Sequence, residues 1–190
     1  STPHFQDEGV LVARTMHIKD GLFLESLASY VSEHQYRERI TRLEPQPGDL
    51  VFTREAPVGE AFVVPLGMRI CLGQRVMLLR PKEGKLEAAY LLAQIYSGSV
   101  KDRISTLTSG TTNPHLNVSE VKEFEIPLPP IVEQQIIASR LCELDSRLGF
   151  EMREQEKFEL MKSGLMDDLL TGRVCVTPLL AEATQQQGSA

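Results

Sequence analysis

The sequence lacks several features that would assign it to common classes of protein. No stretch approaches the ~18 consecutive apolar residues that a membrane-spanning helix needs, and no basic segment followed by an apolar one opens the chain as in a signal peptide. The three cysteines, Cys71, Cys142 and Cys175, are too widely spaced to suggest a zinc site, and we expect free thiols. The sequence therefore predicts a cytoplasmic protein without a membrane span or a metal.

The motifs of common enzymes are also missing. The chain contains no glycine-rich phosphate-binding loop and no Asp/Asn-Pro-Pro-Tyr motif of the kind found in amino-methyltransferases. Nucleases with paired carboxylates have a lysine two residues after the second acid. After Asp49 the second acid would be Glu60, but Phe62 stands at the position of that lysine. The four histidines are isolated, so the sequence gives no Ser-His-Asp or Cys-His arrangement. We therefore predict a non-catalytic protein with no cofactor of its own.

An excess of basic residues, which is usual in proteins that bind nucleic acids, is absent as well. The net charge is −6, with 20 Lys and Arg against 26 Asp and Glu. Residues 1–130 carry 14 basic and 16 acidic side chains, whereas residues 131–190 carry 6 and 10. Charge alone does not indicate DNA, but the first 130 residues are close to neutral and leave room for one basic face.

Residues 1–130 are predicted to form a mostly β domain. Their apolar runs are short and rich in β-branched and aromatic residues, as is typical of strands, and turns with Pro and Gly separate them. The predicted strands cover 9–13, 49–53, 61–64, 69–72 and 75–79. Helical spacing predicts one helix over Leu86–Ser97 and a weaker one over Ser32–Ile40.

The pattern changes after Pro127-Leu-Pro-Pro130, because proline resists entry into a helix. Residues 131–170 contain no proline, and apolar residues recur at the spacing of a coiled coil. The predicted seam consists of Ile137, Leu141, Leu144, Leu148, Phe158, Met161, Leu165 and Leu169. We predict one long helix over 131–172, ended by Gly172, which packs against another helix, and then a partly disordered tail over 173–190.

Several short segments, taken in order, resemble the specificity subunit of type I restriction–modification enzymes. They include Pro47-Gly-Asp-Leu-Val-Phe-Thr-Arg54, which resembles the central hairpin of a target recognition domain, and Leu169-Leu-Thr-Gly172, which resembles the end of the family's spacer helix. The resembling segments are 1–4, 7–10, 17–21, 47–54, 57–59, 72–75, 78–81, 109–117, 126–130, 133–134, 162–166 and 169–172. Each is weak alone, but their order over roughly residues 1–176 makes the resemblance specific.

The resemblance implies an α+β fold, with a mostly β target recognition domain over 1–130 followed by one long coiled-coil-forming helix. It implies recognition of one half of a bipartite site in double-stranded DNA. The partners would be an adenine-N6 methyltransferase subunit, which would bind S-adenosylmethionine, and a restriction and translocation subunit.

A complete subunit of the family has two recognition domains and two helices that pair antiparallel, whereas this chain has one of each. It is therefore either the C-terminal half of a longer subunit, with material missing before Ser1, or a half-subunit that associates with itself through the helix. A protein-binding adaptor that a coiled coil dimerises is the alternative function.

The candidates for DNA contact are polar and basic residues at turns, where side chains can reach phosphates and base edges. They are Arg14, His17 and Lys19 on one face of a segment expected to be extended, Thr53 and Arg54 after a strand, Gln74 and Arg75 after a glycine, and Ser109, Gly110, Thr111, Thr112, Asn113 and His115 in a polar loop. Each of them is also compatible with an ordinary solvated side chain.

Overall fold

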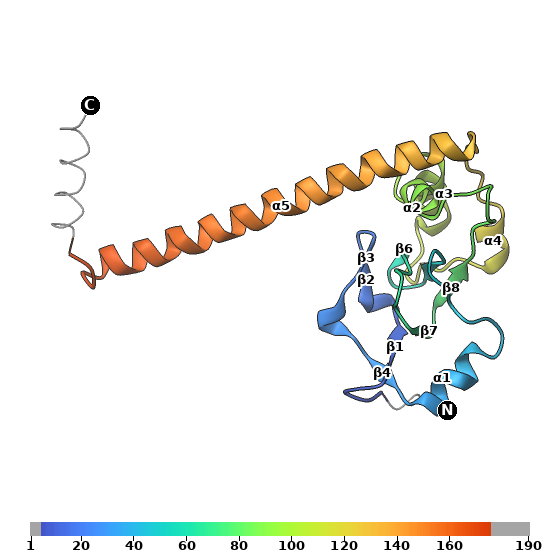
Figure 1. The fold of residues 1–190 in the computed structure, drawn as a ribbon, viewed down its shortest axis with the longest axis horizontal. Coiled ribbons are helices and arrows are strands. Elements are labelled where there is room, and N and C mark those ends of the chain that lie inside the picture. The colour runs from blue at the N-terminus through green and yellow to red at the C-terminus, as the bar shows by residue number, and fades with distance from the viewer. Residues whose placement is uncertain (1–4, 176–190) are drawn as a thin grey trace. The chain divides into compact units, whose positions relative to one another are not determined.

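Three small sheets organise the first part of the chain in this computed structural model, which describes residues 5–175 (Figure 1). Their strands are β1 Val10–Ala13, β2 Ile18–Lys19, β3 Leu22–Phe23, β4 Tyr30–Val31, β5 Leu50–Arg54, β6 Val58–Val63, β7 Ile70–Leu72 and β8 Val76–Leu79. One sheet has the order β4-β1-β7, with β1 antiparallel to β4 and parallel to β7. A β2–β3 hairpin and an antiparallel sheet of order β6-β5-β8 complete the set.

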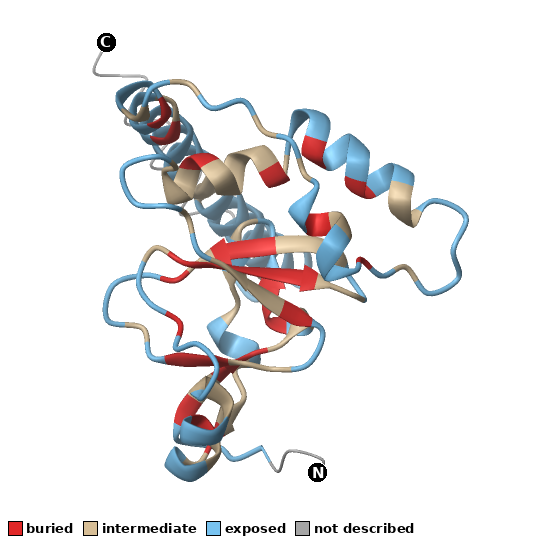
Figure 2. Cartoon of the chain, turned by 90° about the vertical axis from the view of Figure 1, so that its right-hand side faces the viewer, coloured by how far each residue is buried: buried red, intermediate tan, exposed pale blue. Residues whose placement is uncertain are grey.

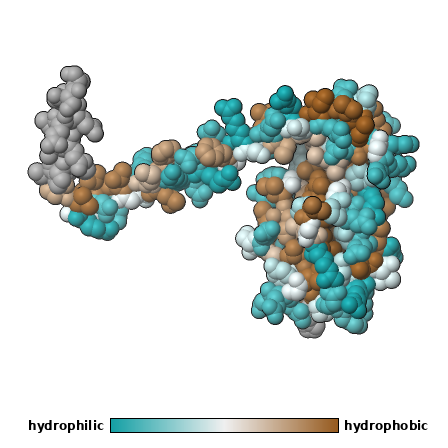
Figure 3. All heavy atoms as spheres, viewed as in Figure 1, coloured by the Kyte–Doolittle hydropathy of each residue, from teal (hydrophilic) through white to brown (hydrophobic). Residues whose placement is uncertain are grey.

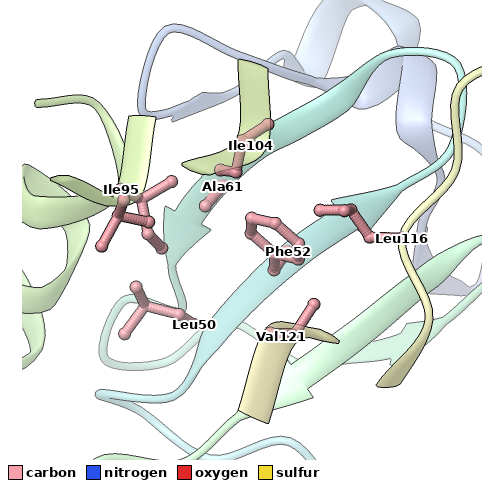
Figure 4. Packing of buried hydrophobic residues seen from close by; sticks show 8 residues of the cluster. Leu50, Phe52, Ala61, Ile95, Ile104, Leu116 and Val121 are labelled. Carbon is pink, nitrogen blue, oxygen red and sulfur yellow. The ribbon is translucent and has the colours of Figure 1, made fainter. Parts of the chain in front are cut away.

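Strand β5 is the centre of the hydrophobic core because both of its faces are covered. Successive side chains of a strand point to opposite faces. Leu50 and Phe52 therefore pack with residues of the helices that follow (Figure 4), while Val51 packs with the opposite cluster that includes Ile70. Buried residues accordingly concentrate on the strands (Figure 2). An almost continuous apolar sequence, Leu-Val-Phe, is what a strand buried on both faces requires.

Four short helices accompany the sheets in the described part of this first region. They are α1 Glu33–Ile40, α2 Ala88–Ile95, α3 Gly98–Thr108 and α4 Val118–Lys122. The helices predicted over 32–40 and 86–97 are confirmed as α1 and α2, and the Ser32 hydroxyl caps α1 by accepting the Gln35 N–H. Helices α3 and α4 are not among the sequence predictions. Two single turns of 3₁₀ helix, η1 Thr15–His17 and η2 Glu25–Leu27, complete the elements before β5.

Helix α5 runs without a break over Ile131–Leu170, which confirms the long helix and the α+β class. Gly172, with φ of 72°, follows it in the left-handed conformation that glycine adopts most readily. No helix within residues 5–175 has the length and apolarity to span a bilayer. The predicted tail begins at residue 173, but residues 176–190 lie outside the described part of the chain.

The chain divides into two compact units, residues 1–141 and 142–190, so the first unit extends beyond the proline segment at 127–130 into α5. Gln134 explains this boundary. Its side chain is 1% exposed, donates to the carbonyl oxygens of Lys85 and Pro129, and accepts the Glu87 N–H. Ala138, one turn later, is also buried. The first two turns of α5 are therefore part of the packing of the first unit.

Replacing Gln134 by leucine should lower the free energy of unfolding by about 2 kcal/mol, because three backbone groups lose the hydrogen-bond partner that the buried Gln134 side chain supplies, at similar side-chain volume. Gln135→Leu is the matched control, since Gln135 is exposed on the next position. Urea unfolding followed by circular dichroism gives both values. Equal stability of the two variants would show that the Gln134 contacts do not hold α5.

Candidate nucleic-acid interface

Three loops that are distant in sequence meet at the end of β5. The Arg54 N–H donates to the carbonyl oxygen of Arg75 at 2.9 Å, which joins β5 to the turn between β7 and β8. The Leu116 N–H donates to the carbonyl oxygen of Arg54 at 2.9 Å, and His115 forms a β-bridge with Glu55. We call Arg54, Glu55, Arg75 and His115 the loop cluster. Arg54, Arg75 and His115 are separate candidates for DNA contact in the sequence, and the structure brings them together.

The two arginines of the loop cluster have different partners. The Arg54 side chain is half-buried and donates one N–H to the Leu116 carbonyl oxygen at 3.2 Å. Arg75 lies 3.1 Å, Nε to Oε2, from the carboxylate of Glu55 and its side chain is 58% exposed. A guanidinium has five N–H donors, so each arginine keeps several for a further ligand. The contacts therefore orient the two groups without using up their hydrogen-bonding capacity.

The turn that carries Arg75 is held closely against β1. The Gly73 N–H donates to the Ala13 carbonyl oxygen at 2.8 Å, and a Cβ at position 73 would lie only 2.8 Å from that oxygen. Arg75 itself has φ of 68°, in the left-handed region. Gln74, between them, is exposed. Glycine at 73 is thus required by this close approach, which fixes where Gln74 and Arg75 leave the domain.

Thr53 has a role inside the domain. Its side chain is fully buried, and its hydroxyl oxygen accepts the Glu60 N–H at 2.9 Å beside an irregularity in the pairing of β5 with β6. This contact shapes the end of β5 where Arg54 emerges. Thr53 therefore does not lie on the surface of the loop cluster.

The polar loop of residues 109–115 follows α3 and leads into the loop cluster. The hydroxyls of Ser109 and Thr111 are turned back to the carbonyl oxygens of Ser105 and Thr108, at the end of α3. Gly110 adopts φ of 75° in the same turn. The remaining candidates, Thr112, Asn113 and His115, are exposed. Half of this loop thus ends the helix, and the other half is available to a ligand.

The segment of Arg14, His17 and Lys19 is not extended as predicted, because Thr15–His17 form a 3₁₀ turn. His17 is fully buried, with Nδ1 2.8 Å from the Val12 carbonyl oxygen. The guanidinium of Arg14 lies over the ring of Phe5, 4.6 Å from its centroid. Only Lys19 is exposed, so the three side chains do not share a face.

Lys19 lies on the β2–β3 hairpin, and Tyr96 holds the turn of that hairpin. The Tyr96 hydroxyl oxygen accepts the N–H groups of Gly21 and Ala61, and its proton is donated to the Glu60 carboxylate at 2.8 Å. Glu60 also accepts the Asp20 N–H at 2.7 Å. Burial is the main reason that the pKa of Tyr96 rises to about 12. Sequence reasoning missed Tyr96, because nothing in its neighbourhood indicates a partner 75 residues earlier.

Burial of His17 makes a pH dependence of stability predictable. Burial is the main cause that lowers the pKa of His17 below its ordinary value, and the nearby charge of Arg14 lowers it further. The unfolded chain, whose histidine titrates near 6.5, therefore binds the proton more readily than the folded chain. The stability that neutral, buried His17 contributes is fully present above the pKa of the unfolded chain. It is lost as the pH falls toward the lower pKa of His17 in the folded state.

We expect the stability difference between pH ~7.5 and pH ~5.5 to be smaller in His17→Gln than in the natural sequence. Urea midpoints at both pH values test this, with His34→Gln as the control because His34 is exposed on α1. An unchanged pH dependence in His17→Gln would contradict the prediction.

Within residues 5–175, no group of three or more histidine, cysteine or acidic side chains is placed to hold a metal ion. Cys71 is buried, which raises its pKa to about 11, so it stays a neutral thiol near neutral pH. The surface described above can offer hydrogen bonds and positive charge to a ligand.

Comparisons with known proteins place the chain in a family. The family described as the type I restriction modification DNA specificity domain matches residues 29–160. The type I restriction enzyme MjaVIII specificity subunit of Methanocaldococcus jannaschii is 26% identical over 187 residues, which cover 92% of this chain and 42% of that protein.

Two solved structures share the fold. A chain described under "Structural basis underlying complex assembly and conformational transition of the type I R-M system" aligns with a TM-score of 0.63 and 22% identity, covering 88% of this chain and 39% of that one. The HsdS subunit from Thermoanaerobacter tengcongensis aligns with a TM-score of 0.54 and 19% identity, covering 86% and 38%. This chain therefore spans less than half the length of these relatives. Since the family match covers more than half of the chain, the protein belongs to the type I restriction–modification DNA specificity family.

Proposed function

We propose that residues 1–141 recognise one half of a bipartite site in double-stranded DNA, and that the loop cluster with Gln74, Thr112 and Asn113 is the surface that reads it. The observation that carries this proposal is the convergence of three loops at the end of β5, held by backbone hydrogen bonds between Arg54, Arg75 and Leu116. A rigid support of this kind lets side chains on loops meet the groups of a duplex in a fixed geometry.

The chemistry of the loop cluster fits base edges and phosphates. Arginine pairs with guanine through two hydrogen bonds, glutamine and asparagine pair with adenine, and a carboxylate accepts from the amino group of cytosine. Glu55 neutralises part of the charge of Arg75 in the free protein. Binding would shift Arg75 from Glu55 to a base or a phosphate.

The chain supplies recognition in this proposal, and partner subunits supply chemistry. An adenine-N6 methyltransferase subunit would carry S-adenosylmethionine and methylate the site, and a restriction and translocation subunit would join in the full complex. Self-association through α5 would bring two recognition domains together on the two halves of a site. The family membership supports these assignments, since its members are DNA specificity subunits.

Selection from a library of random duplexes tests the proposal. The chain, assembled with the methyltransferase subunit, is expected to enrich one short motif at about 150 mM salt, where weak electrostatic contacts are screened. The methyltransferase subunit alone is the control. Enrichment of no motif above that control would overturn DNA recognition by this chain.

A further inference from the structure

The part of α5 in the second unit carries a regular seam in which three positions are polar. Counting alternately four and three residues from Leu144 gives the positions that face a partner helix in a coiled coil. They are Leu144, Leu148, Glu151, Gln155, Phe158, Lys162, Leu165 and Leu169. The regular spacing places Lys162 in the seam and Met161 beside it, whereas the sequence analysis placed Met161 in the seam. All eight side chains are exposed except Leu169, which is half-buried.

The surface of this seam has the relief that a second helix would need. Leu148, Glu151, Met152 and Gln155 line one shallow hollow, and Phe158, Lys162, Leu165 and Leu169 line the next. Residues at these spacings surround the holes that receive side chains of a partner helix. Hydrophobic residues recur along this stretch of α5 (Figure 3).

We propose that the seam of residues 144–169 pairs antiparallel with the same seam of a second copy of this chain, in a single register set by Glu151 opposite Lys162. The proposal rests on the self-association included in the proposed function. The two-fold axis passes between residues 156 and 157. In this register Leu144 faces Leu169 of the second copy, and Leu148 faces Leu165. Glu151 faces Lys162, and Gln155 faces Phe158 next to the axis.

Charge complementarity selects this arrangement. Neither Glu151 nor Lys162 forms an ion pair with another of the described residues 5–175, so both charges are available to a partner. The same register brings Arg147 near Asp168 of the second copy, at the flanking positions just before Leu148 and Leu169, although Asp168 also pairs with Arg173 of its own chain at 3.2 Å. Each contact occurs twice because the pairing is symmetric. The dimer thus gains two Glu151–Lys162 pairs, one on each side of the two central layers in which Gln155 faces Phe158.

Other arrangements lose these pairs. Parallel pairing places Glu151 against Glu151 and Lys162 against Lys162. A shift of the antiparallel register by one heptad places Lys162 opposite Leu144 in one direction, or opposite Phe158 in the other. A charge that faces an apolar residue in a seam is costly and sets the register of a coiled coil. Among these registers, the proposed one alone gives both charged residues a counter-charge.

Charge reversal tests the register by sedimentation velocity, without DNA or other subunits. Glu151→Lys and Lys162→Glu should each raise the dissociation constant of the dimer by roughly tenfold or more, since two attractive pairs become repulsive. The double variant should restore the original value, and an equimolar mixture of the two single variants should form mainly the mixed dimer. Glu156→Lys, which makes the same charge change outside the seam, should leave the dissociation constant unchanged.

Three results would overturn the proposal: a natural chain that is monomeric at micromolar concentrations, single reversals that dimerise as well as the natural chain, or a double variant that is not restored. Helix content by circular dichroism shows that each variant is folded. None of these results bears on DNA recognition, because the duplex selection enriches a motif or fails to do so whichever way α5 pairs.

Discussion

The double variant Arg54→Ala/Arg75→Ala should bind the cognate duplex roughly 100-fold more weakly than the natural chain, because each arginine that reads a base edge is worth about 1–3 kcal/mol. The backbone hydrogen bonds of residues 54 and 75 that join the loops stay in place in this variant, and the substitutions remove only the side-chain contacts with the Leu116 carbonyl oxygen and with Glu55. Binding by the assembled methyltransferase complex to cognate and scrambled duplexes gives the loss of affinity and of preference.

Salt dependence separates the possible roles of the two arginines. A residue that reads a base should lower preference at one position when it is removed, whereas a phosphate contact should lower affinity equally on all duplexes and reduce the salt slope by about one. Arg153→Ala is the matched control, because Arg153 is an exposed arginine of the second unit outside the seam. If neither affinity nor preference changes in the double variant, the loop cluster does not contact DNA. Lys19 and the loop of residues 109–115 would then be the candidates that remain.

Phe52→Ala should lower the free energy of unfolding by about 3–5 kcal/mol, which is a large part of the stability of a small domain. Phe52 is fully buried in the centre of β5 and packs with residues of α2 and α3 (Figure 4). Its ring also meets the ring of Phe124 edge-on, with the two centroids 6.4 Å apart. Its removal leaves a cavity that rigid strands on both sides cannot fill.

Phe150→Ala is the matched control for Phe52→Ala, because Phe150 lies on α5 and is 56% exposed. It should change the stability of the domain very little. Urea unfolding measured by near-ultraviolet circular dichroism reports the tertiary structure in both variants. A loss below about 1 kcal/mol in Phe52→Ala would contradict the central role of β5.

Local sequence was sufficient for five of the eight strands in residues 5–175 and for the long helix, whereas the two-residue strands β2, β3 and β4 were not predicted. Strand β5 was predictable because a short apolar run that begins directly after the turn at Pro47-Gly48 is typical of a strand. Helix α5 was predictable because its apolar spacing continues for 40 residues without proline. Helix α3 has the same signal in Val100, Ile104 and Leu107, but Gly98 and several Ser and Thr residues obscure it. Propensity is a weak guide in such a short segment.

Sequence by itself determined the family, the five longer strands, helices α1, α2 and α5, and the placement of Arg54 and Arg75 beside strands. The tertiary structure decided which candidates share a surface. It joined the two arginines through a backbone hydrogen bond. It also buried His17 and Thr53, because their hydrogen-bond partners, the Val12 carbonyl oxygen and the Glu60 N–H, come from other elements. A polar side chain carries no local sign of whether a partner will allow its burial, and that information exists only once the chain has folded.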